Sequence, residues 1–158
     1  MMTKTESLIK MKEKGAYDAL MLRTAASSGE LTETEIIDRE FAAPTFDNTK
    51  DYSAWPVNSP IQDEGQVWLL LQPHNAAHYE GRPSTLRALW GLAHTKNPNK
   101  AKPYVAPYGT SGLYNNEECM LWSDGKVYVS IIDNNSWNPA DYPAGWEVVT
   151  AEFGGTAE

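Results

Sequence analysis

The hydrophobic positions of residues 1–44 recur at helical spacing and are divided by helix start and stop signals. These signals are two capping-box patterns and one glycine: Thr3 with Glu6, Thr32 with Glu35, and Gly15. They predict short helices over residues 3–15, 16–26 and 32–41. Because helices of this length are marginal in isolation, we expect them to pack on the rest of the chain, on copies of themselves or on another protein.

Beyond Pro44 the pattern changes to short apolar runs separated by Gly, Pro, Asn and Asp, which is typical of short strands and turns. An apolar run over 118–122, a turn at 123–125 with the sequence Ser-Asp-Gly, and an alternating run over 126–132 predict an antiparallel hairpin. Residues 146–149 predict a third strand after a proline-rich connection.

An internal repeat relates two parts of this strand-rich region. Residues 65–68 align with 125–128 at an offset of 60, which also places Asn75 on Asn135. After one loop the offset becomes 56, and four further pairs match in order: Pro83 with Pro139, Ala88 with Ala144, Trp90 with Trp146, and Leu92 with Val148. This order indicates a duplication in which the second copy is four residues shorter in one loop.

These patterns predict a mainly β fold: two small three-stranded β modules in tandem, preceded by a short α-helical N-terminal segment. The predicted divisions are a helical anchoring or oligomerisation segment at 1–44, module 1 at 51–93, a linker at 94–107, module 2 at 108–150 and a tail at 151–158. Each module is near the size limit for independent folding without disulfides, so large aromatic rings must supply most of its core. We expect matched strand aromatics to fill these cores: Trp68 with Trp90, and Tyr128 with Trp146.

Composition and charge exclude several classes of function. A formal net charge of -8, with only six Lys or Arg beyond residue 50, argues against nucleic-acid binding, which needs a basic face. The sequence has no run of about 18 apolar residues and no secretory-signal pattern, so we expect neither membrane spanning nor classical secretion. The single Cys119 excludes an intramolecular disulfide and a cysteine-based metal cluster. We expect it to be a buried thiol of a protein made in a reducing cytoplasm.

Two pairs of adjacent carboxylates are candidates for glycoside hydrolysis: Asp63 with Glu64, and Glu117 with Glu118. Neighbours on a strand point to opposite faces, whereas hydrolysis needs two carboxyl groups across one cleft. Solvated surface is therefore the favoured interpretation of both pairs. Because Ser84 also lacks a nucleophile elbow, we expect no enzymatic activity.

Candidate metal ligands and phosphate-binding residues are equally weak. His74 and His78 have the four-residue spacing of a helical metal site, but the glutamate of a zinc protease motif is missing between them. A hydrogen bond within the turn is the favoured interpretation of His74. The lysines of residues 96–102 indicate a solvated linker rather than a phosphate site. We expect no cofactor and no metal.

Trp137 differs from the strand aromatics because it lies in a polar turn, residues 134–139, where an indole would be awkward to bury. An exposed indole there indicates a binding platform. The apolar face of a sugar ring matches an aromatic face, and neighbouring Asn and Asp side chains can bond the ring hydroxyls. One such module would bind weakly, so function would depend on several copies.

The same residues resemble a known family. The pattern of Gly-x-Val-Trp/Tyr, an apolar strand, a loop, and a proline followed by Ala-x-Trp is similar to the small chitin-binding modules of carbohydrate-binding families five and twelve, over about residues 52–149. In that family the Trp two residues before the proline contacts the ligand, and this position is Trp137 in module 2 but Gly81 in module 1. The turn and the resemblance together predict five carbohydrate-binding residues: Trp137, Tyr142, Asn135, Trp122 and, standing in for the missing indole of module 1, Tyr79.

Modules of this type behind a short helical segment are also similar to small structural proteins of phage and prophage tails or baseplates. This resemblance implies a virion component that is made in the host cytoplasm and acts outside. Residues 1–44 would contact other virion proteins or form a homo-oligomer, and the modules would bind chitin-like or cell-wall polysaccharide. Two alternatives stay open: a purely structural virion assembly protein with vestigial modules, and an accessory module of a chitinase-type enzyme.

Overall fold

The computed structural model describes residues 3–149, which form a helical N-terminal part followed by two three-stranded antiparallel sheets. The helical elements are α1 (Lys4–Ser27), α2 (Glu33–Asp38) and the 3-10 turns η1 (Glu40–Ala42), η2 (Ala76–His78), η3 (Pro98–Lys100) and η4 (Pro143–Gly145). The strands are β1 (Pro60–Asp63), β2 (Gln66–Leu70), β3 (Trp90–Leu92), β4 (Cys119–Leu121), β5 (Val127–Ser130) and β6 (Trp146–Val149). The predicted fold class is confirmed. The predicted tail at 151–158 and the last residue of module 2 lie outside the described residues.

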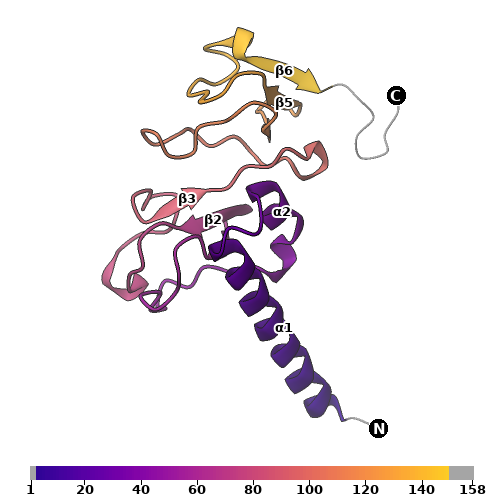
Figure 1. Cartoon of the computed structure of the whole chain (residues 1–158), viewed down its shortest axis with the longest axis vertical. Helices are drawn as coiled ribbons and strands as arrows, with labels where there is room; N and C mark the ends of the chain where they lie inside the picture. The colour runs from indigo at the N-terminus through magenta and orange to yellow at the C-terminus, as the bar shows by residue number, and fades with distance from the viewer. Residues whose placement is uncertain (1–2, 150–158) are drawn as a thin grey trace.

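The parts follow one another along the long axis of the molecule (Figure 1). Helix α1 projects from one end, module 1 with α2 against it lies in the middle, and module 2 lies at the other end. Only the C-terminal part of α1 touches the body of the protein, where Leu22 and Ala26 are buried. The N-terminal half therefore extends away from both modules.

The sequence predicts the start of helix α1 correctly but not its end. The Thr3 hydroxyl accepts a hydrogen bond from the Glu6 backbone N–H, and the Glu6 carboxylate accepts one from the Thr3 backbone N–H, so the capping box is confirmed. The prediction that Gly15 ends this helix is wrong. A glycine inside a helix costs only about 1 kcal/mol relative to alanine, and an ion pair between Lys14 Nζ and Asp18 Oδ2, 3.1 Å apart, spans the position.

The glycine that does end α1 is Gly29, whose φ is +84°. Its N–H donates to the Ala26 carbonyl, and the N–H of Glu30 donates to the Ala25 carbonyl. This pair of bonds is a Schellman motif, and it needs the left-handed conformation that glycine adopts without steric cost. The segments predicted as two helices over 3–15 and 16–26 are therefore one helix.

Helix α2 attaches the N-terminal part to module 1. The predicted capping box between Thr32 and Glu35 is confirmed. Ile36 and Ile37 are buried in a cluster with Val67 of β2 and with neighbouring apolar residues from α1 and the chain after β3. These helices are expected to pack on another surface, and that surface is the face of the first sheet that carries Val67.

Module 1 has an aromatic core on the opposite face of its sheet. Strand β2 lies between β1 and β3, and its Trp68 and Leu70 point into a cluster with Tyr52 and Trp90. The Tyr52 and Trp90 rings meet edge to face with centroids 5.3 Å apart. Strand β2 is thus buried on both faces, by the helices on one side and by the aromatic core on the other.

Module 2 repeats this arrangement with the same strand register. Tyr128 of β5 lies opposite Val148 of β6, as Trp68 of β2 lies opposite Leu92 of β3. Its buried core consists of Tyr114, Met120 and Trp146, against which Tyr128 is partly buried. The Tyr114 and Trp146 centroids are again 5.3 Å apart. The register confirms the sequence offsets of the repeat. Of the predicted core aromatics, Trp68, Trp90 and Trp146 are buried, whereas Tyr128 is only partly buried.

Residues 94–107, predicted as a linker, pack against the rest of the chain, although Lys96 and Lys100 of the predicted solvated stretch 96–102 are exposed. Thr95 is buried and pairs with Cys119, and the N–H of Tyr104 donates to the Leu121 carbonyl, so this segment runs beside β4. The Lys102 ammonium lies 2.6 Å from a carboxylate oxygen of Glu40. The connection joins the N-terminal part, module 1 and module 2 into one packed unit.

Candidate functional site

Two aromatic side chains lie exposed and close together on the loop before β6. Trp137 is 49% exposed and Tyr142 is 39% exposed, and their ring centroids are 5.1 Å apart at an angle of 58°. The exposure predicted for Trp137 is confirmed. We call these two residues the aromatic surface of module 2.

The backbone of Trp137 is held from both sides by buried groups. The Asn135 side-chain oxygen accepts a hydrogen bond from the Trp137 N–H at 3.1 Å, and the Trp146 indole N–H donates to the Trp137 carbonyl at 3.0 Å. Asn135 also donates from its amide nitrogen to Ser130 Oγ and to the Gly145 carbonyl, both at 3.1 Å. The exposed indole is therefore carried on a turn that the module core fixes in place.

Asn135 itself is 0% exposed, so the prediction that it contacts a sugar is wrong. All of its side-chain hydrogen-bonding atoms are engaged inside the protein. It positions Trp137 without lining the surface. A turn asparagine looks the same in sequence whether its amide points outward or inward, and here the buried Ser130 hydroxyl draws it inward.

The polar groups that lie beside the aromatic surface are Asn138 and Asp141, which sequence analysis did not single out. The Asn138 side-chain oxygen accepts a hydrogen bond from the Asp141 N–H at 2.7 Å, and its nitrogen donates to the Asp141 carboxylate at 3.2 Å. Both residues are solvent-accessible and directly adjoin Trp137 and Tyr142 in the chain. They supply amide and carboxylate atoms that can bond hydroxyl groups of a stacked ligand.

The other two predicted residues lie elsewhere. Trp122 is half-buried against Tyr104, with centroids 5.2 Å apart, and lines a groove that does not include Trp137. Tyr79 is exposed in module 1 and meets the His74 ring edge to face. Among the described residues, neither of them forms an aromatic ring pair with Trp137 or Tyr142.

Module 1 cannot carry the missing indole in its present conformation. Gly81 has a φ of +118°, and a Cβ atom there would lie 2.5 Å from Thr85 Oγ1. Both the backbone angle and the lack of space exclude a tryptophan at this position unless the loop rearranges. The two modules have thus diverged at the position where the family resemblance places the ligand contact.

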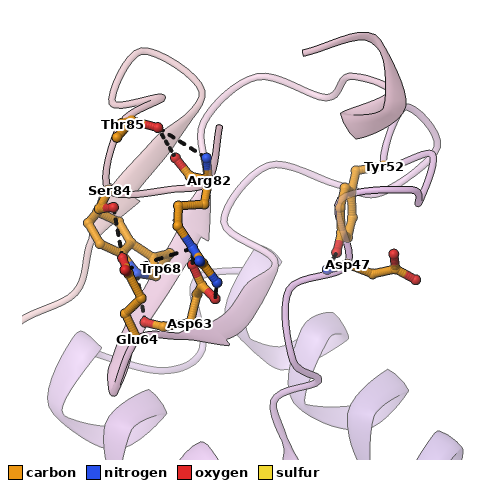
Figure 2. A network of polar contacts seen from close by, with 8 residues as sticks. All are labelled: Asp47, Tyr52, Asp63, Glu64, Trp68, Arg82, Ser84 and Thr85. Carbon is orange, nitrogen blue, oxygen red and sulfur yellow. Dashed lines mark hydrogen bonds and ion pairs between the residues drawn. The ribbon is translucent and has the colours of Figure 1, made fainter. Parts of the chain in front are cut away.

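Titratable groups near the modules serve the fold. The prediction of solvated surface is wrong for Asp63, which is buried and accepts two hydrogen bonds from the Arg82 guanidinium, at 2.8 Å and 2.9 Å (Figure 2). Burial raises the pKa of Glu118 to about 7, in part offset by a hydrogen bond from the Asn115 N–H. Burial also lowers the pKa of His94 to about 4 and raises that of Cys119 to about 11.

His74 makes the turn hydrogen bond that was expected for it, with Nδ1 2.7 Å from the Gln72 carbonyl. Within residues 3–149 there is no cluster of three or more His, Cys, Asp or Glu side chains that could hold a metal ion. Over the same residues, no helix is both long and apolar enough to cross a membrane.

Comparison with models of protein families and with curated proteins finds no match to this chain. The site is therefore assigned from its own geometry.

Proposed function

We propose that this chain is a non-catalytic glycan-binding protein, and that the aromatic surface of module 2 is its binding site. The observation that carries this proposal is the exposure of Trp137 and Tyr142 on a turn held by buried hydrogen bonds. Large aromatic side chains supply most of the core of a module this small. An ordered indole that is half exposed therefore gives up apolar burial that would otherwise stabilise the fold. Such a ring is typical of a surface that recognises a flat apolar face.

A single surface of this size binds weakly. Stacking on an aromatic ring contributes about 0.5–1.5 kcal/mol beyond burial, so two rings add about 1–3 kcal/mol, which is less than the ~4.1 kcal/mol of millimolar affinity. Useful retention on a polysaccharide then requires several copies of module 2 on one assembly, where effective concentration raises avidity. The glycan is a chitin-like or cell-wall polysaccharide with repeated pyranose rings.

We place this protein in a phage tail or baseplate, made in the host cytoplasm and acting outside. Helix α1 supports this placement because its projecting part leaves apolar side chains uncovered. The exposed apolar residues of α1 are Leu8, Ile9, Met11, Tyr17, Leu20 and Met21. Attachment of α1 to neighbouring virion proteins, or to copies of itself, would cover them and display module 2 at the far end (Figure 1).

A second candidate function is structural assembly without glycan binding. Gly81 favours it, because module 1 has no ring at the position of Trp137 and no space for one. On this hypothesis the modules are spacers, and only α1 and its partners matter for function.

The experiment that separates the two functions measures retention of the full chain on insoluble chitin and on peptidoglycan. We expect the native protein to be retained, and Trp137→Ala and Tyr142→Ala each to weaken retention about tenfold. Tyr108→Ala is the matched control, since it removes an exposed aromatic ring of module 2 that lies outside the aromatic surface. Tyr79→Ala tests module 1, and we expect a smaller loss.

Retention of native protein and Trp137→Ala to the same extent would refute the site. Failure of the native protein to bind either polysaccharide, when presented at high density, would refute the glycan function and favour structural assembly.

A further inference from the structure

A second surface of module 2 lies in a groove of about 360 Å³ that does not include Trp137 or Tyr142. The groove is lined by Trp122, Tyr128, Pro139, Ala140, Pro143, Trp146 and Val148. Aromatic rings and prolines thus form most of its walls. Glycan binding at the aromatic surface makes no use of these residues.

The corresponding place in module 1 is filled by an arginine. The repeat places Trp68 where module 2 has Tyr128, and Arg87 where module 2 has Pro143. The Arg87 guanidinium carbon lies 5.4 Å from the centroid of the Trp68 ring. Its Nη1 donates to the Ala106 carbonyl at 3.1 Å. Module 1 therefore stacks its own guanidinium group on the ring that is equivalent to Tyr128.

Polar contacts also close the edge of the place in module 1 that corresponds to the groove of module 2. Arg82 pairs with Asp63, and the Ser84 hydroxyl donates to the Glu64 carboxylate at 2.8 Å, beside the Trp68 ring (Figure 2). The offset of 56 makes Asn138 and Ala140 of module 2 equivalent to Arg82 and Ser84. The strand register makes Trp122 equivalent to Asp63, since Met120 pairs with Tyr128 as Ile61 pairs with Trp68. None of these three can form the same ion pair or carboxylate bond, so the groove stays open.

The charge of module 2 suits a cationic occupant. Residues 108–149 contain six acidic side chains and one basic side chain. One of the carboxylates, Asp124, accepts a hydrogen bond from the Tyr128 hydroxyl at 2.7 Å, and this bond lowers the pKa of Asp124. An ionised carboxylate therefore lies at the phenol end of the groove, where it would attract a positive group.

We propose that the groove of module 2 binds the arginine side chain of a partner polypeptide, in the position that Arg87 occupies in module 1. A planar guanidinium group can stack on Tyr128 and direct N–H donors toward Asp124, which a lysine ammonium cannot do in the same geometry. Module 2 then has two separate surfaces, one for a glycan and one for a protein. This proposal does not depend on glycan binding.

The test uses the full chain and a small probe, N-acetyl-arginine amide, titrated while the indole N–H signals of Trp122 and Trp146 are followed by NMR. The citrulline analogue is the probe control, because it keeps the shape of the side chain and lacks the charge. We expect saturable shifts with the arginine probe at millimolar concentration, and at least fivefold weaker binding of the citrulline probe.

Two variants test the location. Pro143→Arg supplies module 2 with the side chain that fills module 1, and we expect it to abolish the shifts. Ile131→Arg is the matched control, since it adds the same charge to an exposed position of module 2 outside the groove. Asp124→Asn removes the carboxylate from an exposed turn, and we expect at least threefold weaker binding even if Pro143→Arg does not fold.

Equal binding of the arginine and citrulline probes would overturn the proposal, and so would undiminished shifts in folded Pro143→Arg. Shifts of Trp122 produced by chitin oligosaccharides in place of the arginine probe would assign the groove to sugar and also overturn it.

Discussion

Asn75 and Asn135 occupy the same position of the repeat, yet the structure predicts that their removal has unequal effects on stability. Each side-chain oxygen accepts a hydrogen bond from the backbone N–H two residues later, at 3.0 Å from Ala77 and at 3.1 Å from Trp137. The Asn135 amide nitrogen makes two further bonds inside the core, whereas Asn75 is half-buried and its nitrogen has no comparable bond among the described residues. The Asn135→Ala substitution therefore removes three bonds, two of them buried, and Asn75→Ala removes one exposed bond.

The magnitudes follow from this count. A net contribution of about 1 kcal/mol for each bond gives about 3 kcal/mol for Asn135→Ala, and about 0.5–1 kcal/mol for the more exposed Asn75→Ala. Part of the first cost is recovered, because Ser130 Oγ still donates to the Ile132 carbonyl, and the Gly145 carbonyl still accepts from the Ile131 N–H. We expect the two variants to differ by about 2 kcal/mol in free energy of unfolding.

Urea unfolding followed by tryptophan fluorescence and by far-ultraviolet circular dichroism measures both values. Coincidence of the two probes establishes whether the modules unfold together. Equal costs for the two variants, within about 0.5 kcal/mol, would refute the inference that the buried amide of Asn135 organises the turn. We also expect Asn135→Ala to weaken glycan retention, because Trp137 loses the acceptor that fixes its backbone.

Three further predictions concern the helix, the carboxyl group with the raised pKa and the thiol. Gly15→Ala should stabilise α1 by about 0.5–1 kcal/mol, because a Cβ at Gly15 meets no atom within 4 Å. The gain should appear as a higher helical signal on heating, and a loss of helicity would contradict a continuous α1. Burial raises the pKa of folded Glu118 to about 7 from 4.5, so folding favours its protonated form, and the resulting stability is present below pH 4.5 and lost as the pH rises through 7. Glu118→Gln should therefore match the native protein near about pH 4.5 and exceed it by about 1–2 kcal/mol near about pH 8, after allowance for the partial exposure of the group; equal stabilities at both pH values would contradict the burial. Cys119 is buried with its pKa raised to about 11, so it should resist a thiol reagent in the native protein and react fully in denaturant; rapid native reaction would show that the strand β4 is accessible.

Local signals in the sequence predicted much of the fold. Both capping boxes depend on residues three positions apart, and both helices begin where those residues lie. The repeat predicted which positions of the two modules correspond, and these positions have corresponding partners in the two sheets. The exposure of Trp137 followed from its polar turn, which offers few apolar atoms to cover an indole.

Other features depend on residues far apart in the chain, and only the tertiary structure decided them. Gly15 does not end α1, because the helix continues to a Schellman motif at Gly29 and packs on module 1 through its last turns. Asp63 is buried because Arg82, 19 residues later, neutralises it. The sequence by itself therefore determined the fold class, the starts of α1 and α2, the matched positions of the repeat and the exposed ring. The packing of α2 on the first sheet, the inward amide of Asn135 and the open groove of module 2 arose from long-range contacts, whose energies no local pattern contains.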